Sequence, residues 1–276
     1  MQDSVTPLLR EAGITKEPLP PGVTGVGLRT TPDLFGFGLL EAVAEHEILR
    51  HADPDDRDHD GISGRPHWTD DGIGRFGRKG QVSNLTDFIT DAWIYEQGIT
   101  SEAEPDEQTI AGEPLPDGVD PTLDPEISEE DLEASIRFVQ FLAPPSRVHG
   151  GMNAVRGARV FSEIGCASCH VPALRTDRHP IRAMSRKKVF AYTDLLLHDM
   201  GEELSDICNG EALPSEFRTE PLMGLRFSTI YMHDGRATTI EQAIEMHGGE
   251  ATGSRDRFLE LSHRKRSQLL RFLETL

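Results

Sequence analysis

The chain is poor in cysteine, in long apolar runs and in positive charge, and each shortage excludes a class of protein. Three cysteines in 276 residues cannot form the disulfide framework that holds many small secreted domains together. No apolar run reaches the length that crosses a bilayer, which excludes a membrane span. Lysine and arginine number 28 against 47 acids, and the net charge of −19 argues against nucleic acid, whose phosphates would be repelled. The charge instead suits a basic partner, a salty environment or a merely solvated acidic surface.

Two of the three cysteines lie in the segment Gly165-Cys166-Ala167-Ser168-Cys169-His170. Two thiols three positions apart, followed directly by a histidine, are typical of covalent haem attachment: Cys166 and Cys169 form thioethers, and His170 binds the iron. A zinc site or a redox-active thiol pair is the alternative. Zinc would need further ligands at matching spacing, and only Cys208 remains, for which we expect a free thiol without an assigned role. The sequence therefore predicts one haem c.

Haem of this type is generally attached outside the cytoplasmic membrane in bacteria, so we expect a periplasmic or other extracytoplasmic location. The first residues show neither the charged nor the apolar region of a signal peptide. We therefore expect that the export signal has been removed or lies outside this sequence.

The pattern of apolar residues predicts a mainly α-helical protein with long loops. Residues 1–28 are rich in proline and glycine and are predicted to form an irregular arm. Helices are expected over 34–49, capped by Asp33; from Asn84 to near Gly98; and after the capping box Ser128–Asp131. The acidic segment 100–127 is predicted to be a loop. The pair Pro144-Pro145 ends the last of these helices, so it separates a unit of 29–146 from one of 150–276.

The second unit has the helix order of a cytochrome c domain. A helix from Asn153, with an apolar stripe ending at Ile164, leads into the haem motif, and a closing helix begins after Ser262. Gly157 would let the closing helix cross the opening helix closely, because glycine has no side chain.

Residues 53–64 resemble the start of a calcium-binding loop. Asp56, Asp58 and Asp60 alternate before Gly61, so their carboxylates are expected to converge on one hard cation. The match to an EF-hand is incomplete, because His67 occupies the position of the bidentate glutamate. The shell would have to be completed by Asp53, Asp70 or Asp71, and the alternative is a solvated acidic turn.

Eight sequence blocks occur in order after residue 28: 36–42, 53–65, 74–77, 165–170, 194–201, 218–222, 232–236 and 247–251. In this order they resemble the bacterial di-haem oxidoreductase family, relatives of the di-haem cytochrome c peroxidases. Members carry one haem motif in each of two cytochrome domains, whereas this chain has a single motif. The resemblance therefore implies that 29–146 is the haem-less remainder of an N-terminal cytochrome-like domain. It also implies that 150–276 is the domain whose haem passes electrons.

The resemblance also implies a distal ligand. In the related peroxidases this ligand lies fourteen positions after the histidine of a His-Asp-Gly turn, and counting from His233 reaches His247. Met246, His198 and Met200 are competitors. His198 and His233 are otherwise expected to bond to backbone or to a haem propionate, and Arg218, Arg226 and Arg236 to pair with propionates. The remaining residues expected to contact the haem are Phe161, Pro172, Leu174 and Leu222.

Ligation by His170 and His247 would leave the iron no open position, so the leading hypothesis is an electron-transfer cytochrome with a redox partner protein. The alternative is a peroxidase or other haem oxidoreductase subunit. A separate haem-bearing chain would then rebuild the two-haem unit and cover the apolar faces of 36–52 and 132–142. A third hypothesis is a calcium-binding scaffold without redox function. Whether the chain is an enzyme stays open at this point.

Overall fold

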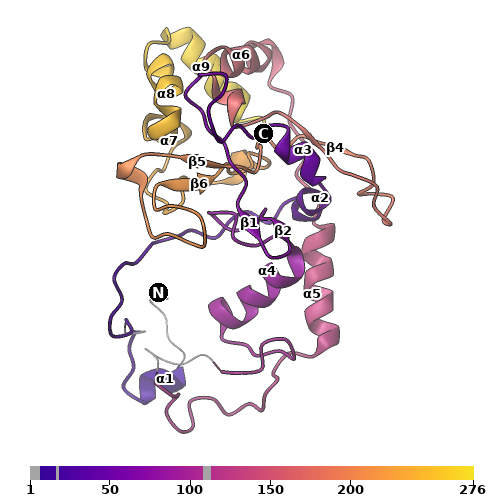
Figure 1. Ribbon diagram of the computed structural model, residues 1–276, viewed down its shortest axis with the longest axis vertical. Coiled ribbons are helices and arrows are strands. Elements are labelled where there is room, and N and C mark those ends of the chain that lie inside the picture. The colour runs from indigo at the N-terminus through magenta and orange to yellow at the C-terminus, as the bar shows by residue number, and fades with distance from the viewer. Residues whose placement is uncertain (1–6, 17–18, 108–112) are drawn as a thin grey trace.

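The computed structural model describes residues 7–16, 19–107 and 113–276. Its regular structure is mainly helical, as the sequence predicts, and the strands are only two or three residues long (Figure 1). No helix among the described residues is long and apolar enough to cross a membrane. The α-helices are α1 (Pro7–Glu11), α2 (Phe37–Glu41), α3 (Glu45–Leu49), α4 (Leu85–Asp91), α5 (Glu129–Phe141), α6 (Gly151–Glu163), α7 (Ile240–Glu245), α8 (Thr252–Leu259) and α9 (His263–Leu273).

Within the described residues the strands form three antiparallel pairs, each of two strands that follow one another in the chain. Short 3₁₀-helices lie between them, and a π-helix, η1 (Ala92–Glu96), continues α4. The strand pairs are β1 (Trp68–Thr69) with β2 (Gly72–Ile73), β3 (Leu174–Arg175) with β4 (Lys188–Val189), and β5 (Leu197–Asp199) with β6 (Glu216–Arg218). The 3₁₀-helices are η2 (Cys166–Ser168), η3 (Glu202–Leu204), η4 (Leu225–Phe227) and η5 (Gly249–Ala251).

The predicted single helix over 34–49 is wrong, because the structure has the two short helices α2 and α3. Ala44 between them has an extended backbone, and Val43 forms a β-bridge to Thr176 instead of continuing the helix. Asp33 does not cap α2 either. The N-cap of α2 is Gly36, whose backbone is in the left-handed region. The Asp33 carboxylate instead accepts a hydrogen bond from the Ser228 hydroxyl.

The predicted helix starts at Asn84 and Ser128 are confirmed. The Asn84 side chain accepts from the Asp87 N–H and the Ser128 hydroxyl from the Asp131 N–H, which satisfies donors that the first helical turn leaves free. In the predicted irregular arm, residues 7–11 form α1, whereas residues 1–6 and 17–18 of that arm lie outside the described residues.

The first hydrophobic core contains residues from both sides of Pro144-Pro145. It combines α2 to α5 with the segment around β3, β4 and β5, including Leu174, Val189 and Leu196. The fully buried Lys79 adds a polar connection: its ammonium lies 3.1 Å from Asp206 and donates to the carbonyls of residues 213, 214 and 216. The part before the proline pair is therefore packed directly against the part after it.

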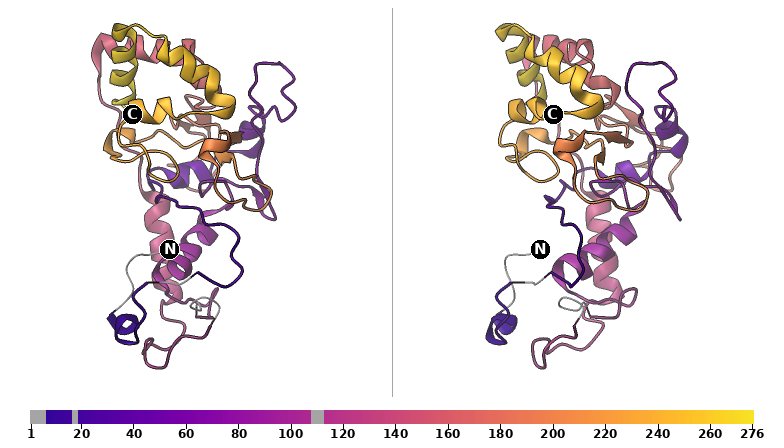
Figure 2. Two further views of the ribbon diagram at one scale, coloured as in Figure 1. Left: turned by 90° about the vertical axis from the view of Figure 1, so that its left-hand side faces the viewer. Right: turned by 60° about the vertical axis from the view of Figure 1, so that its left-hand side comes forward.

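The second core lies where α6 and α9 cross, at the top of Figure 1 and in both views of Figure 2. A Cβ built on Gly157 would lie 1.9 Å from the carbonyl oxygen of Gln268, so only glycine permits this approach. The predicted crossing is confirmed, as is the Ser262 cap of α9. Phe161 packs edge-on against Tyr192 and Phe272 in this core. The crossing thus fixes the end of α6, where the haem motif begins.

Candidate functional site

A cavity of about 420 Å³ lies between the end of α6, the segment around β5 and β6, and α7. Cys166, Cys169, His170 and His247 all line it. Gly165, with φ of 92°, makes the left-handed turn that leads from α6 into η2 and places the two thiols at the cavity. The structure therefore brings together four residues that are up to 81 positions apart in the sequence.

The two imidazoles are held in the same way. His170 Nδ1 lies 3.0 Å from the Tyr192 carbonyl oxygen, and His247 Nδ1 lies 2.7 Å from that of Ala243. These bonds orient each ring, and neither Nε2 has a hydrogen-bond partner within the described part of the chain. Burial, and to a smaller extent His247, lower the pKa of His170 to about 4, and burial also lowers the pKa of His247. Both rings are therefore neutral near pH 7, which is the form that binds metals.

His247 lies just beyond a helix and not within it, because α7 ends at Glu245 and Met246 is its C-cap. The two glycines that follow lie against the backbone of the β5 end. A Cβ on Gly248 would be 2.8 Å from the Met200 carbonyl oxygen, and one on Gly249 would be 2.1 Å from that of Asp199. These two glycines therefore let the backbone after His247 lie close to the end of β5. This contact fixes the position of His247.

Two of the three competing ligands are unsuited to bind iron in this cavity, either by position or by their hydrogen bonds. Met246 is 37% exposed and does not line the cavity, whereas Met200 and His198 do. Both ring nitrogens of His198 are taken by carboxylates: Nε2 lies 2.9 Å from Asp194 and Nδ1 2.7 Å from Glu250. His198 therefore has no free nitrogen for iron.

The carboxylate partners of His198 were missed by the sequence reasoning, which expected bonds to backbone or to a propionate. Burial disfavours the charged ring, but the bonds to Asp194, Cys169 and Glu250 raise the pKa of His198 well above its ordinary value. Its Nδ1 is also 3.6 Å from the Cys169 sulfur. Asp194 could have been suspected from its place four residues before His198, whereas nothing local points to Glu250.

Glu250 also connects the site to the acidic loop. Its carboxylate accepts from the Ser63 hydroxyl at 2.6 Å and from the Ser63 N–H at 3.1 Å. Hydrogen bonds to His198 and Ser63 lower the pKa of Glu250 even though burial acts in the opposite direction. The loop that ends at Gly64 is therefore tied to the wall of the cavity through one partly buried carboxylate.

Several residues predicted to contact the haem lie elsewhere. Leu174 is fully buried in the first core through strand β3, and Pro172 is exposed. Arg226 donates to the carbonyls of Leu276 and Ser146, and Arg236 is paired with Asp234. None of these four lines the cavity.

The other predicted contacts do line the cavity. Phe161, Leu222 and His233 belong to its wall. The His233 ring is stacked on Phe217 at 4.1 Å between centroids, and its nitrogens bond to no backbone atom of the described residues. Arg218 also lines it, buried and paired with Glu220, so it is the predicted propionate partner that the structure places at the site.

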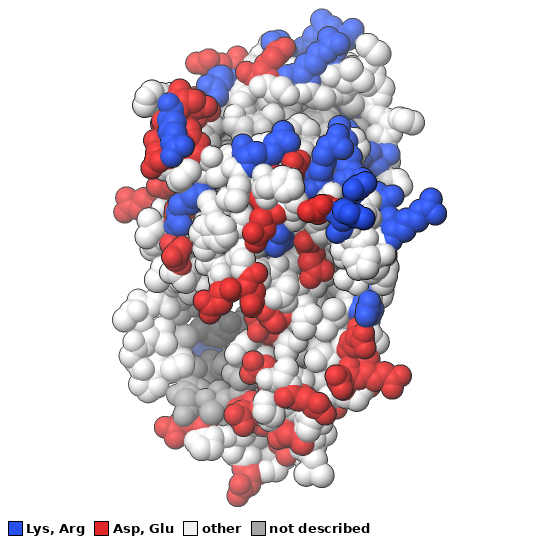
Figure 3. All heavy atoms as spheres, turned by 45° about the vertical axis from the view of Figure 1, so that its right-hand side comes forward, with Lys and Arg blue, Asp and Glu red and all other residues white. Residues whose placement is uncertain are grey.

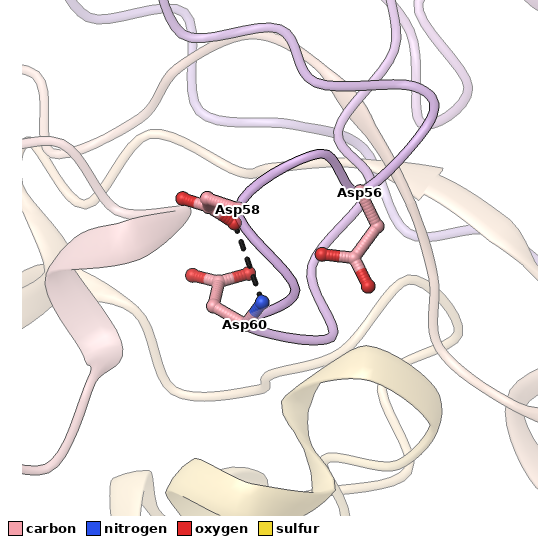
Figure 4. Close-up of side chains that lie close together, drawn as sticks. All are labelled: Asp56, Asp58 and Asp60. Carbon is pink, nitrogen blue, oxygen red and sulfur yellow. Dashed lines mark hydrogen bonds between the residues drawn. The ribbon is translucent and has the colours of Figure 1, made fainter.

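The acidic loop brings three carboxylates together (Figure 4). Oxygens of Asp56, Asp58 and Asp60 all lie within 4.8 Å of one another, and the Asp60 N–H donates to Asp58. Asp53, which was expected to complete the shell, instead accepts from the backbone N–H groups of residues 57 and 58. The other residues considered, His67, Asp70 and Asp71, are not in this group either; His67 Nδ1 lies 2.7 Å from the Lys79 carbonyl oxygen.

Comparison with known proteins identifies one family. The family model described as "Di-haem oxidoreductase, putative peroxidase" matches residues 22–276. The methylamine utilization protein MauG of Methylorubrum extorquens is 31% identical over 140 residues, which is 46% of this chain and 35% of that protein. The match thus spans about a third of the length of that relative.

Two solved structures are more distant. Hydrazine synthase of Kuenenia stuttgartiensis is 16% identical with a TM-score of 0.40, covering 100% of this chain and 99% of the other. A MauG-like protein associated with microbial copper homeostasis is 15% identical with a TM-score of 0.44, covering 94% and 92%. At these TM-scores neither similarity decides the fold of this chain.

Proposed function

The chain belongs to the di-haem oxidoreductase family, which implies haem c and haem-based redox chemistry, and from this premise we propose that it is an electron-transfer cytochrome. In this proposal Cys166 and Cys169 would hold one haem covalently, and His170 and His247 would bind its iron. Residues 150–276 form its haem domain, and 29–146 is the haem-less remainder of a second cytochrome-like domain. We place the protein outside the cytoplasmic membrane, where such haem is generally attached.

The matched pair of imidazoles carries this proposal. Ligating histidines usually donate their second ring N–H to a carbonyl or carboxylate, which fixes the tautomer and the ring orientation. His170 and His247 both have this arrangement, with the Nε2 of each left free at one cavity. His198 serves as an internal comparison, because it lines the same cavity and has both nitrogens occupied.

Bound haem would supply an iron that takes up and releases one electron. The chain would hold the group covalently through its two thiols, whose pKa values burial raises, for Cys166 to about 12. Phe161 and Leu222 would exclude water, and Arg218 would offer a guanidinium to a propionate. With two imidazoles on the iron, no position is left for peroxide, which favours electron transfer over catalysis.

The axial ligand can be tested by redox titration of the haem-loaded protein. We expect a six-coordinate low-spin absorption spectrum that peroxide leaves almost unchanged, and a higher midpoint potential in His247→Met, because a thioether favours ferrous iron. The matched control is His149→Met, the same change at an exposed histidine, which should leave the potential unaltered. An unaltered potential in His247→Met would show that another residue is the ligand.

One observation favours the second candidate, an enzyme subunit completed by a separate haem-bearing chain. The apolar faces of 36–52 and 132–142 mostly pack on each other, since Leu40 and Val139 share the first core. Phe138 and Phe141 of α5 nevertheless stay 66% and 53% exposed. A pyridine haemochrome assay on the native complex would decide: one haem per chain supports the electron carrier, and two per assembled unit with a peroxide-sensitive spectrum support the enzyme.

A further inference from the structure

The surface beside the haem motif carries positive charge on a chain that is acidic overall. The segment 175–188, which runs from the last residue of β3 to the first residue of β4, contains six lysines and arginines and a single acid, Asp177. Arg147 lies next to it, 5.8 Å from the Phe190 ring. We call this surface the basic face and define it by Phe190, Arg147, Arg175, Arg178, Arg182, Arg186, Lys187 and Lys188.

The charges of the basic face have no carboxylate partners in the described chain. None of its seven cations forms an ion pair with a described carboxylate, and all seven side chains are exposed. Elsewhere on the surface such pairs are common, for example Arg137 with Glu133 and Lys265 with Glu163. Figure 3 shows lysine and arginine gathered in the upper half of the molecule, whereas acids dominate the lower half. The segment 175–188 together with Arg147 therefore carries a local excess of unpaired positive charge.

An apolar hollow lies within the basic face. Phe190 is 46% exposed, with the Lys188 ammonium 4.8 Å from its ring. A cavity of about 270 Å³ beside it is lined by Arg147, Lys188 and apolar side chains, among them Leu39, Pro145 and Leu276. An apolar hollow with cations at its rim fits a protein surface on which carboxylates surround an apolar centre.

The basic face is also close to the proximal histidine. The guanidinium of Arg147 lies 5.5 Å from the centre of the Tyr192 ring, and the Tyr192 carbonyl oxygen accepts the hydrogen bond from His170. Tyr192 is buried and separated from Phe190 by one residue. The surface is thus connected to the proposed iron ligand through a single side chain and its backbone.

We propose that the basic face docks an acidic electron-carrier protein, which exchanges one electron with the haem across Tyr192 and His170. One partner loses the electron that the other gains, and no bond is made or broken. This inference rests on the proposed function. It also differs from what the total charge suggests: a net charge of −19 favours a basic partner, whereas the basic face fits an acidic one.

The test uses the haem-loaded protein and fluorescein-labelled flavodoxin, an acidic one-electron carrier, as the probe. Because the whole chain would repel this probe, binding at low ionic strength requires a local positive surface, and salt should weaken it. The double variant Arg182→Glu with Lys187→Glu should weaken binding, read by fluorescence anisotropy, by about tenfold or more. The matched control is Arg156→Glu with Arg264→Glu, the same charge change at exposed, unpaired arginines of α6 and α9, which should change binding less than twofold.

The second measurement is the rate of haem reduction by reduced flavodoxin. We expect it to fall in the Arg182/Lys187 variant in proportion to binding, while reduction by dithionite stays unchanged. Absence of binding, or an equal loss in the control variant, would overturn the inference. So would tighter binding of a labelled oligonucleotide, or self-association that involves the basic face in place of flavodoxin binding. A high-spin spectrum with binding intact would remove the proposed function but leave the docking surface.

Discussion

Replacing Gly157 by alanine tests the helix crossing that positions the haem motif. A Cβ at this position would lie 1.9 Å from the Gln268 carbonyl oxygen and 2.7 Å from the Phe272 Cβ. Ordinary contacts to a Cβ begin near 3.4 Å, and the closest obstacle is backbone, so α9 would have to move away by about 1 Å or more. Movement of α9 would open the second core around Phe161 and Phe272.

The magnitude follows from two opposing effects. Overpacking of this kind costs about 1–3 kcal/mol, and the severe backbone clash points to the upper end. Alanine returns up to about 1 kcal/mol through its higher helix propensity. We therefore expect Gly157→Ala to lower the free energy of unfolding by about 2 kcal/mol, which for a chain of this size corresponds to a melting temperature lower by roughly 4–8 °C.

The assay is thermal and urea unfolding followed by circular dichroism, with Gly253→Ala as the matched control. Gly253 is an exposed glycine inside α8, and a Cβ there would meet its nearest neighbour, an Arg257 nitrogen, at 3.4 Å. This control should be stabilised by about 0.4–1 kcal/mol. If Gly157→Ala were as stable as the control, the close crossing of α6 and α9 would be refuted.

Three further predictions concern buried charge and calcium. Because the folded pKa of Glu250 is lowered, its stabilisation is present above the ordinary value of 4.5 and is lost as pH falls through the lowered pKa. Glu250→Gln should therefore be less stable than wild type by about 1–3 kcal/mol in urea at pH 7, and the two should converge in acid; a constant difference would contradict this. Lys79→Met removes one donor from each of three carbonyls, two of which keep a backbone N–H donor, and it leaves the buried Asp206 with only Arg29. A urea titration should therefore show a loss of about 3–5 kcal/mol, and an unchanged midpoint would mean that these bonds contribute little. Calcium should raise the melting temperature, and Asp58→Asn should remove this response; an equal response in both would place calcium elsewhere.

The amino-acid sequence by itself determined the features that depend on neighbouring residues. The haem motif at 166–170 and the caps at Asn84, Ser128 and Ser262 could all be read from spacing and residue type. Such features depend on backbone geometry and helix period, which act over a few residues at a time. The order of blocks also gave the family that the family model supports.

Only the tertiary structure decided which distant residues meet. Leu174 is an apolar residue that was predicted to contact the haem, but it lies in β3, which pairs with β4, and it packs in the first core instead of lining the cavity. His198 lies beside the haem motif, yet its nitrogens are occupied by Asp194 and by Glu250, which lies 52 residues away. The helix over 34–49 breaks because Val43 pairs with Thr176.

Charge shows the same division between sequence and structure. The total of −19 is a property of composition and says nothing about where the charges lie. Folding places Arg147 and Lys188 against the Phe190 ring, beside Tyr192, whose carbonyl oxygen is bonded to His170. Acids dominate the lower half of the molecule in Figure 3. Electrostatic recognition depends on the local field at the contact surface, because salt screens charges farther than about 8–10 Å away, and that field exists only once the chain has folded.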